Sequence, residues 1–498
     1  MPEKIDLVLI NPGNRRASYA GLGNELAGIE PPIWCALIAA FIRKHGYSVG
    51  IVDADVDNLS PEEAAEKIIR LNPLLAGIVV LGTNPSASST PKMPAARNLL
   101  NALSKNNNSF LTILSGLHPS ALPERTLNEE NVDFVCQGEG FYTFLDLLAG
   151  IKSGNGIKQD TIPGLWYRSN GKPVLGTKPS VAENLDGLPF AAWDLLPMEK
   201  YRAHNWHCFD NLKARSPYAV VYTSLGCPFK CSYCNIHALY DGGPGIRFRS
   251  IRNVISEIDM LVENYKIRNF KILDELFVLN EDRVMEFCDL MIKRNYGLNI
   301  WAYARADTVG EKILTQMKKA GINWLAYGFE SGSAKVRRSV TKGRLTPEII
   351  KKAVDATHKA GIHIVANFIF GLPEDDLTTM QETLDTAKEL NCEYANFYVA
   401  MAYPGSRLYE EAICSGVELP ESWSGYAQFS EETLPLATKY LSSAEVLRFR
   451  DKAFYDYHHR AEYLEMIEEK FGKDSAEYIK NMLKYKINRK FAYAKDNK

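Results

Sequence analysis

The first 150 residues alternate short apolar runs with segments in which apolar residues recur at helical spacing. The apolar runs predict strands, and the helical spacing predicts helices between them. The expected strands are 5–10, 48–53, 75–81, 110–115 and 132–136. The expected helices are 32–45, 61–71, 93–104 and 139–148. Strands that are apolar on both faces are typical of a parallel sheet covered by helices on both sides, so residues 1–150 are predicted to form a doubly wound, Rossmann-like α/β domain.

The same alternation resumes after residue 216. The expected strands are 218–224, 269–274, 299–304, 323–328, 363–370 and 394–401. The expected helices are 250–265, 282–294, 311–320, 347–360 and 377–390. Six such units are too few for the eightfold barrel, whose active site lies at the carboxyl ends of its strands. Residues 216–415 are therefore predicted to form an incomplete (β/α)6 TIM-type barrel.

Two segments lack this alternation. Residues 151–215 are expected to be a linker, in which Asn170-Gly171 could close a hairpin. Residues 416–498 have helical periodicity and many aromatic residues, which predicts a helical cap over the barrel mouth. The end of this cap, Lys480 to Lys498, is basic. It could contact anionic lipid or RNA, but a solvated helix that frays at the terminus is the favoured interpretation.

Composition narrows the class of protein. The chain has 498 residues, 46 % hydrophobic and 24 % charged, which is ordinary for a soluble globular protein of two or three domains. The net charge of −2 provides no overall field that would favour nucleic acid or an anionic membrane. The sequence shows neither a signal peptide nor an apolar run long enough to span a bilayer. A cytoplasmic location and a small-molecule substrate are expected.

Three cysteines follow the first predicted barrel strand, in the run Cys-Pro-Phe-Lys-Cys-Ser-Tyr-Cys. Thiolates of Cys227, Cys231 and Cys234 could bind one face of a four-iron cluster and leave the fourth iron without a protein ligand. An open metal position is a place for chemistry. The alternative is a structural zinc loop, with His237 as the fourth ligand. The other six cysteines, at 35, 136, 208, 288, 392 and 414, are expected to be mostly buried free thiols.

The C-x3-C-x2-C spacing, with aromatic Tyr233 before the last cysteine, resembles the radical S-adenosylmethionine (SAM) enzymes. The resemblance implies a [4Fe-4S] cluster whose open iron binds the amino and carboxylate groups of SAM. One electron from the cluster then cleaves SAM to a 5′-deoxyadenosyl radical. The resemblance also implies an electron donor such as flavodoxin or ferredoxin as a partner.

Polar residues after the later barrel strands extend this resemblance. Asp274 and Glu275 resemble the family's Asp-Asp-x-Phe, and a carboxylate suits the ammonium group of SAM. Arg305 could pair with the SAM carboxylate, and Glu330 matches the family position near the ribose hydroxyls. The predicted SAM contacts are Tyr233, Asp274, Glu275, Arg305, Glu330, Asn367, Gly371 and Met401. Each of them alone could instead be a rim ion pair or a helix cap, and their order behind the cysteine loop favours the SAM role.

Two loops of the first domain resemble the cobalamin-binding domain that precedes many radical SAM domains. They are Ser-Gly-Leu-His-Pro-Ser at 115–120 and Gln-Gly-Glu-Gly-Phe at 137–141, which depart from the usual pattern at Ser115, Ser120 and Phe141. Glycine-rich strand ends also occur for turn geometry alone. The predicted cobalamin contacts are Asn11, Gly82, Thr83, Asn84, Ser115, Gly116, His118, Gly138 and Glu139.

No histidine is expected to bind the cobalt of this cobalamin. The sequence has no Asp-x-His-x-x-Gly motif, and His118 lies on a proline-flanked turn, where a loop hydrogen bond is the favoured role. His204, His207 and Cys208 lie close together just before the barrel. Their spacing fits no standard ligand pattern, so they are expected to line an interface rather than hold a metal.

The resemblance implies a cobalamin-dependent radical SAM enzyme, most simply a methyltransferase that acts on an unactivated carbon or phosphorus atom. A radical cyclisation or rearrangement, as in the anaerobic porphyrin-ring cyclases, is the alternative within enzymes. Methylthio transfer to tRNA is less favoured, because those enzymes have three further N-terminal cysteines and this chain has only Cys35 and Cys136 there. The alternative from another class is a non-catalytic Fe–S or cobalamin sensor.

Overall fold

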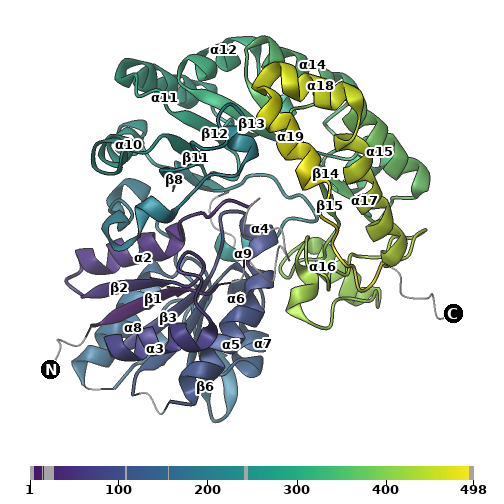
Figure 1. Ribbon diagram of the computed structural model, residues 1–498. Coiled ribbons are helices and arrows are strands. Elements are labelled where there is room, and N and C mark those ends of the chain that lie inside the picture. Colours follow the sequence, from purple (N-terminus) through teal and green to yellow (C-terminus); the bar gives the residue numbers. More distant parts are fainter. Residues whose placement is uncertain are drawn as a thin grey trace.

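The computed structural model describes residues 5–13, 15, 27–106, 109–154, 156–240 and 245–492. It contains an N-terminal α/β domain, an open barrel and a C-terminal helical segment (Figure 1). The barrel strands form an arc whose concave side faces the N-terminal domain. None of the described helices is long and apolar enough to cross a membrane.

The N-terminal domain is built on a seven-stranded sheet. Its strands are β1 (Leu7–Asn11), β2 (Val49–Asp53), β3 (Leu75–Val80), β4 (Leu111–Gly116), β5 (Phe134–Cys136), β6 (Leu165–Ser169) and β7 (Lys172–Leu175). They lie in the order β2-β1-β3-β4-β5-β6-β7, parallel as far as β5. The order reverses between β1 and β3, and ligands of such sheets bind at the carboxyl ends of strands beside that reversal.

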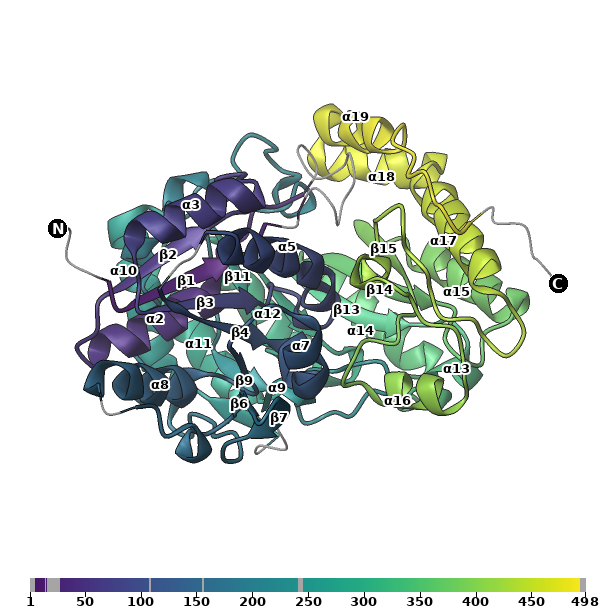
Figure 2. The same cartoon turned by 90° about the horizontal axis from the view of Figure 1, so that it is seen from below.

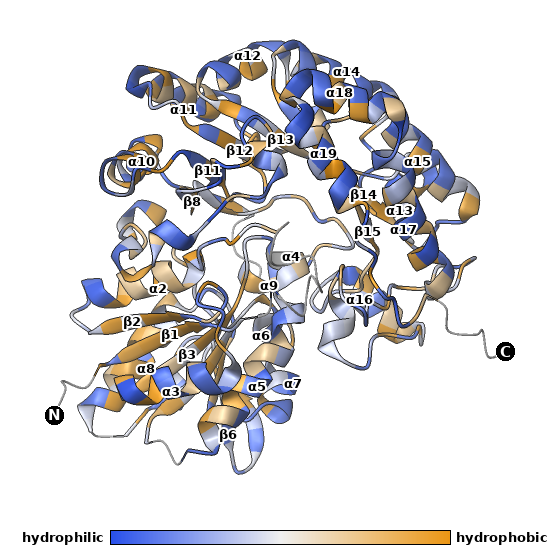
Figure 3. Ribbon diagram, viewed as in Figure 1, coloured by the Kyte–Doolittle hydropathy of each residue, from blue (hydrophilic) through white to orange (hydrophobic). Residues whose placement is uncertain are grey.

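Helices cover both faces of this sheet, which confirms the doubly wound prediction. The helices are α2 (Ile33–Lys44), α3 (Pro61–Leu71), α4 (Pro85–Ser88), α5 (Met93–Ser104), α6 (Leu117–Ala121), α7 (Pro123–Glu129) and α8 (Phe141–Ser153). Figure 2 shows α3 and α5 on one side of the sheet and α2 and α8 on the other. In Figure 3 the central strands are mostly hydrophobic, as expected when both faces are buried.

The predicted linker, 151–215, takes part in the N-terminal sheet. Its strands β6 and β7 form an antiparallel hairpin, and β6 also pairs with β5. The turn at Asn170 and Gly171 has φ angles of 51° and 76°, which confirms the hairpin predicted from these two residues. The rest of the segment forms short turns, including η4 (Leu185–Gly187), η5 (Trp193–Leu195), η6 (Met198–Lys200) and η7 (Trp206–Cys208).

The barrel has the six parallel strands that the sequence predicts. They are β8 (Tyr218–Val221), β11 (Asn269–Ile272), β12 (Asn299–Ala304), β13 (Ile322–Glu330), β14 (His363–Phe370) and β15 (Tyr394–Val399), in that order across the sheet. The outer helices are α10 (Ile251–Tyr265), α11 (Glu281–Arg294), α12 (Glu311–Lys319), α14 (Pro347–Lys359) and α15 (Leu377–Leu390). Among the described residues β8 and β15 do not pair with each other, so the sheet stays open there.

The C-terminal segment covers the β15 edge. Its helices are α16 (Arg407–Cys414), α17 (Ser443–His458), α18 (Ala461–Phe471) and α19 (Lys473–Met482). Helix α17 packs along β15, where Arg450 Nε donates to the Phe397 carbonyl at 2.6 Å and Tyr457 donates to the Cys392 carbonyl at 2.6 Å. Backbone groups of an edge strand are thereby shielded from other chains.

The prediction of a fraying helix at Lys480–Lys498 is wrong for the described residues after Met482, although Lys480, Lys484, Lys486 and Lys490 are exposed as expected. Helix α19 ends at Met482, and the chain continues without helix to residue 492. Arg489 is buried, and it bonds Asp451 of α17 at 3.0 and 3.1 Å and the Ser430 carbonyl at 2.9 Å. A buried, paired arginine holds the segment against the protein. Lys495 and Asp496 lie outside the described residues.

A buried carboxylate links the amino ends of strands β14 and β15 to helix α18. Glu393 accepts hydrogen bonds from the Ile364 amide at 2.8 Å and from Lys470 Nζ at 2.5 Å, and its Oε2 lies 3.2 Å from His358 Nε2. Burial alone would raise its pKa, but the histidine hydrogen bonds and the charge of Lys470 outweigh burial and hold the pKa of Glu393 well below its usual range. The ionised form is thus stabilised by folding.

We expect Glu393→Gln to lower the free energy of unfolding by about 1.5–3 kcal/mol at neutral pH, because it weakens the charged hydrogen bonds from Lys470 and His358, whose side chains are 37% and 28% exposed. Since the native pKa is depressed, this contribution is present above the unfolded pKa of about 4.3 and is lost as the pH falls further. Urea unfolding at several pH values would measure it. The exposed Glu389→Gln on α15 is the control. A constant difference between wild type and Glu393→Gln down to acid pH would contradict the prediction.

Candidate active site

One large cavity lies between the N-terminal domain, the concave side of the barrel and the C-terminal segment. Its volume is about 1220 Å³, above the roughly 300–1,000 Å³ of ordinary small-molecule pockets. Residues of all three parts line it, from Asn11 in the first strand to Ile487 near the end of the described chain. The cavity has room for more than one ligand.

The three predicted cluster cysteines all line this cavity. Cys227 follows a short strand, β9 (Ser224–Gly226), which pairs with β10 (Ile246–Phe248). Gly226 has φ 93°, and a Cβ there would lie 2.6 Å from the Gly245 carbonyl oxygen, so only glycine fits the start of the loop. Cys227, Cys231 and Cys234 are half-buried, and none of the three forms a disulfide. Thiols on one loop that face a cavity fit an iron–sulfur cluster that is reached by a substrate.

In the zinc alternative His237 is the fourth ligand, but one of its two ring nitrogens is already engaged. His237 Nε2 lies 2.8 Å from the Phe229 carbonyl oxygen, so this nitrogen is engaged within the loop itself. Over the described residues, no group of three or more histidine, cysteine, aspartate or glutamate side chains is placed to hold a single metal ion. Ligands of a cluster bind separate irons and need not converge on one point, so the cysteine geometry fits a cluster.

The two acidic residues after β11 have different environments. Asp274 is buried and accepts hydrogen bonds from the Thr223 amide at 2.6 Å, the Thr223 hydroxyl at 2.5 Å and the Ser224 hydroxyl at 2.6 Å. These bonds fix the turn that leads into Cys227. Asp274 is absent from the described cavity lining, whereas Glu275 belongs to it. Asp274 as a direct SAM contact therefore stays a prediction, and its observed role is to position the cysteine loop.

Glu275 is placed to receive a cation. Its Oε1 accepts from the Tyr240 hydroxyl at 3.2 Å, and within the described residues its buried Oε2 has no hydrogen-bond partner. Burial raises the pKa of Glu275 to about 8. An ammonium group beside it would favour the ionised form and supply the missing partner. The geometry therefore suits Glu275, rather than Asp274, to the amino group of SAM.

Glu330 forms the centre of a second polar cluster on the barrel rim. It accepts from the Tyr233 hydroxyl at 2.8 Å and from Lys342 Nζ at 2.7 Å, and Lys342 also donates to the Gly328 carbonyl at 3.0 Å. The register of β13 shifts between Gly328 and Glu330, and Glu330 has φ 66°. A non-glycine residue in this conformation is held there by its surroundings and often marks a functional site. Sequence reasoning missed Lys342, since no motif points to it.

We expect Glu330→Gln to raise the KM for SAM by about tenfold to a hundredfold, because a charged hydrogen bond is worth about 1.5–3 kcal/mol. The readout is 5′-deoxyadenosine formation at varied SAM concentration, with KM and kcat separated. Exposed Lys351→Met on α14 is a control for general damage. An unchanged KM would show that Glu330 does not contact SAM.

The other predicted SAM contacts divide into two groups. Arg305, Asn367 and Met401 line the cavity. Arg305 is held by Asp307 at 2.9 and 2.8 Å, and its guanidinium lies 4.0 Å from the ring centroid of Phe229 in the cysteine loop. Gly371 is absent from the described lining: its N–H bonds Asp375 at 3.0 Å, and a Cβ there would lie 2.4 Å from Val446 of α17. Its SAM contact stays a prediction.

Some of the predicted cobalamin contacts line the cavity, and others are absent from its described lining. Asn11, Gly82, Thr83 and Asn84 line the cavity, and they follow β1 and β3, where the strand order reverses. Asn11 is fixed by Lys92 Nζ at 2.5 Å and by Asp53 at 2.7 Å. The remaining predicted contacts are absent from the described lining and stay predictions: Ser115, Gly116, His118, Gly138 and Glu139.

His118 and Glu139 have structural partners. The His118 ring lies 3.1 Å from the Thr90 hydroxyl and packs edge-on against Trp423, and burial lowers the pKa of His118 to about 3. Its predicted role as a loop hydrogen-bonder is confirmed. Glu139 forms a buried ion pair with Arg247 of β10 and accepts from the Ala182 amide at 2.8 Å. This pair links the N-terminal domain to the strand beside the cysteine loop.

His204 contacts the N-terminal part of the chain, whereas His207 and Cys208 contact residues of the barrel strands. His204 lines the cavity and accepts a hydrogen bond from the Gly28 amide at 3.2 Å. His207 is fully buried, and Cys208 Sγ lies 3.3 Å from Asn269 Oδ1 of β11. The position of His204 agrees with the expected interface role, whereas for His207 and Cys208 this role stays a prediction.

Known protein families match the two main parts of the chain that line this cavity. Residues 19–148 match the B12 binding domain family, and residues 221–387 match the Radical SAM superfamily. An uncharacterized methyltransferase of Pyrococcus horikoshii is 31% identical over 87% of this chain and 89% of its own length. The anaerobic magnesium-protoporphyrin IX monomethyl ester cyclase of Rubrivivax gelatinosus is 28% identical, over 79% and 68%. The cytidylyl-2-hydroxyethylphosphonate methyltransferase of Streptomyces wedmorensis is 26% identical, over 83% of each.

Two solved structures share the whole arrangement. The radical SAM methyltransferase TsrM of Kitasatospora setae, solved with cobalamin and a [4Fe-4S] cluster, has a TM-score of 0.68 at 15% identity and covers 91% of this chain and 89% of its own. The cobalamin-dependent radical SAM enzyme OxsB has a TM-score of 0.69 at 15% identity, over 97% and 71%. At such identities the likeness shows the fold.

The family matches agree with the observed site: the radical SAM half implies a [4Fe-4S] cluster and SAM, and the B12-binding half implies cobalamin. Cavity-lining thiols, the unpartnered Glu275 oxygen and the loops at the strand reversal fit these groups. The related methyltransferases favour methyl transfer over the cyclase alternative. The chain belongs to the cobalamin-dependent radical SAM enzymes, in the group that contains methyltransferases.

Proposed function

We propose that this protein transfers a methyl group from SAM to an unactivated carbon or phosphorus atom of a small molecule. The observation that carries the proposal is that the cysteine loop and the loops after β1 and β3 line one cavity. When bound, the cluster with SAM supplies a radical that removes a hydrogen atom, and cobalamin carries a methyl group. Such chemistry needs all reacting groups within one enclosed space.

The chain's own residues would orient SAM and limit the access of water. Glu275 suits the ammonium group, Arg305 the carboxylate and Glu330 the ribose hydroxyls, since each presents opposite charge or acceptors. Aromatic residues of the C-terminal segment, such as Phe454 and Tyr478, line the same cavity. They would cover the reacting groups and reduce side reactions with solvent.

The test uses protein that is reconstituted without oxygen and supplied with cobalamin, reductant and SAM. A methyltransferase should form S-adenosylhomocysteine as well as 5′-deoxyadenosine, because it uses SAM both as methyl donor and as radical source. A cyclase or a rearrangement enzyme would form 5′-deoxyadenosine without S-adenosylhomocysteine. A non-catalytic sensor would form neither, so the two products separate all three interpretations.

The same proposal includes a cytoplasmic location and a protein that donates the electron to the cluster. Five of the nine cysteines, at 35, 136, 208, 288 and 392, are buried free thiols, which suits a reducing, cytoplasmic setting. A small electron carrier such as flavodoxin or ferredoxin would supply the single electron. Replacing a chemical reductant by reduced flavodoxin in the assay above tests this partner directly.

A further inference from the structure

The inner part of the cavity holds a charged pair that lies outside the predicted SAM contacts. Lys271 of β11 is buried, and its Nζ donates to Glu30 Oε1 at 3.3 Å and to the Thr83 carbonyl at 3.1 Å. The same Nζ lies 4.4 Å from the centroid of the Trp301 ring. These contacts occupy the ammonium group and balance the charge of Glu30.

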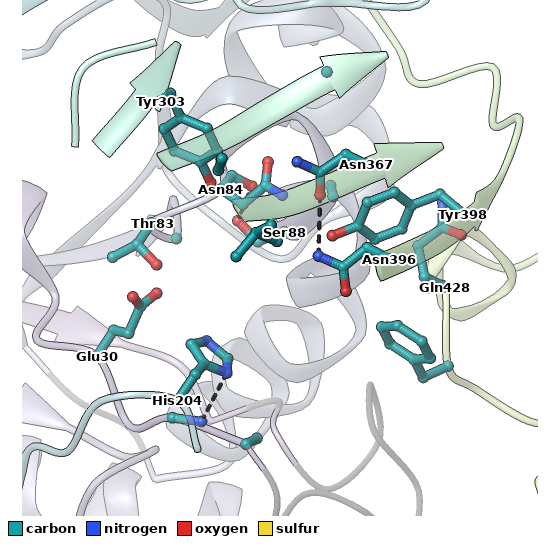
Figure 4. Close-up of a pocket in the computed structure, with 18 of the residues that line it drawn as sticks. Glu30, Thr83, Asn84, Ser88, His204, Tyr303, Asn367, Asn396, Tyr398 and Gln428 are labelled. Atoms are coloured by element: carbon teal, nitrogen blue, oxygen red, sulfur yellow. Dashed lines mark hydrogen bonds between the residues drawn. The ribbon is translucent and has the colours of Figure 1, made fainter. Parts of the chain in front are cut away.

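Glu30 presents one carboxylate oxygen to the cavity. Its Oε1 accepts from Lys271 and from the Tyr218 hydroxyl at 2.7 Å, whereas no described residue donates to Oε2. The side chain is 15% exposed, and Figure 4 shows its carboxylate pointing into the open part of the pocket. Burial raises the pKa of Glu30, but the charge of Lys271 and the hydrogen bonds from Tyr218 and Lys271 outweigh it and lower the pKa overall. Oε2 is therefore a charged acceptor.

His204 presents a hydrogen-bond donor beside this acceptor. Ile29 and Arg202 exchange backbone hydrogen bonds of 2.9 and 3.0 Å, which brings Glu30 and His204 to the same wall of the cavity (Figure 4). Burial lowers the pKa of His204 to about 4, so the ring is neutral at physiological pH. Because the Gly28 amide donates to Nδ1, the ring proton is on Nε2.

Aromatic rings adjoin this pair. The Trp206 ring stacks on His204, with centroids 6.0 Å apart and planes within 12°, and it meets the Trp301 ring at 5.1 Å. Trp206, Trp301 and Tyr303 all line the cavity. Aromatic rings at a cavity wall favour a planar ligand group that packs against their exposed parts.

We propose that Glu30 and His204 bind a neutral, planar group of the substrate that carries an N–H next to a carbonyl, such as a carboxamide or a lactam. This proposal rests on the proposed function, because it assigns the substrate end of the same cavity. Glu30 Oε2 accepts from the N–H, and His204 Nε2 donates to the carbonyl. Because the Lys271–Glu30 pair has no net charge, an ion of either sign would lose its hydration at this site without gaining a counter-charge, and it is therefore disfavoured.

Cobalamin itself carries carboxamide side chains, so the same pair could bind the cofactor instead. The experiment therefore has two arms. In the first, cobalamin-loaded protein is titrated with nicotinamide, nicotinate and 3-(aminomethyl)pyridine, which share a flat ring and differ in charge, and binding is followed by saturation-transfer NMR. In the second, cobalamin affinity is measured by visible absorption.

The variants remove the pair without leaving an unpaired charge. Glu30→Leu combined with Lys271→Leu removes the acceptor and its partner together, and His204→Phe removes only the donor. Exposed Glu62→Gln on α3 is the matched control. We expect nicotinamide to bind wild type and Glu62→Gln at least about tenfold more tightly than either charged probe, and both pocket variants to lose this preference while cobalamin affinity changes less than about twofold.

Equal or tighter binding of nicotinate or of the amine would overturn the proposal. A loss of cobalamin affinity in the pocket variants would also overturn it and assign the pair to the cofactor. S-adenosylhomocysteine formation by wild type, measured without any probe, tests the proposed function separately. If that product is absent while nicotinamide binds selectively, the methyltransferase proposal fails and the recognition site stands.

Discussion

A Cys231→Ala variant will form no 5′-deoxyadenosine from SAM above background, whatever reductant is supplied. Cys227, Cys231 and Cys234 are the only three cysteines that line the described cavity, and a cluster held by two of them loses a corner ligand. Without the intact cluster no electron reaches SAM. Product formation by mass spectrometry and the iron and sulfide content of the reconstituted protein check this result.

The matched control is Cys414→Ala. Cys414 is an exposed free cysteine at the end of α16 and is not part of the cavity lining that the structure describes. It should keep both its cluster and wild-type activity. If Cys231→Ala kept full activity, the reaction of this protein would not require the cluster.

Replacing Glu139 by alanine will lower the free energy of unfolding by about 3–5 kcal/mol, the usual cost of leaving a buried charge unpaired. Glu139 is fully buried, and its partner Arg247 lies on β10, which pairs with the strand that leads into Cys227. Arg247 also donates to the Ala182 carbonyl at 2.6 Å. The change should therefore weaken the contact between the N-terminal domain and the cysteine loop.

A double variant separates charge from packing. Glu139→Leu combined with Arg247→Met removes both charges, and replacing a buried pair by apolar residues is often neutral or stabilising. Urea unfolding should show most of the loss in the single variant and little in the double one. A single variant within about 1 kcal/mol of wild type would mean that the pair does not hold the two domains together.

Most helices and strands could be predicted from the sequence, because the residues that begin and end them lie next to them in the chain. The expected helix 61–71 coincides with α3, where Ser60 and Glu63 form a capping box. The expected helix 377–390 coincides with α15, which begins after the capping residue Asp376. The cysteine loop was predicted because its ligands lie within one short run of sequence.

Features that depend on contacts between distant residues could not be predicted. Strands β6 and β7 pair with the N-terminal sheet, although their sequence marks only a hairpin. Asp274 and Glu275 are adjacent, and only the fold shows that the first carboxylate accepts hydrogen bonds from Thr223 while the second faces the cavity. The Lys271–Glu30 contact spans 241 positions along the chain, and no local pattern marks it.

We infer that three thiolates hold a cluster, with one iron left for SAM, in a cavity shared with cobalamin. Mössbauer spectroscopy of the reconstituted protein, recorded with and without SAM, tests it most directly. We predict a [4Fe-4S] signal in which one iron differs from the other three, and a change in that iron alone when SAM is added. Four equivalent irons that do not respond to SAM, or zinc in place of iron in active protein, would show that this loop does not hold such a cluster.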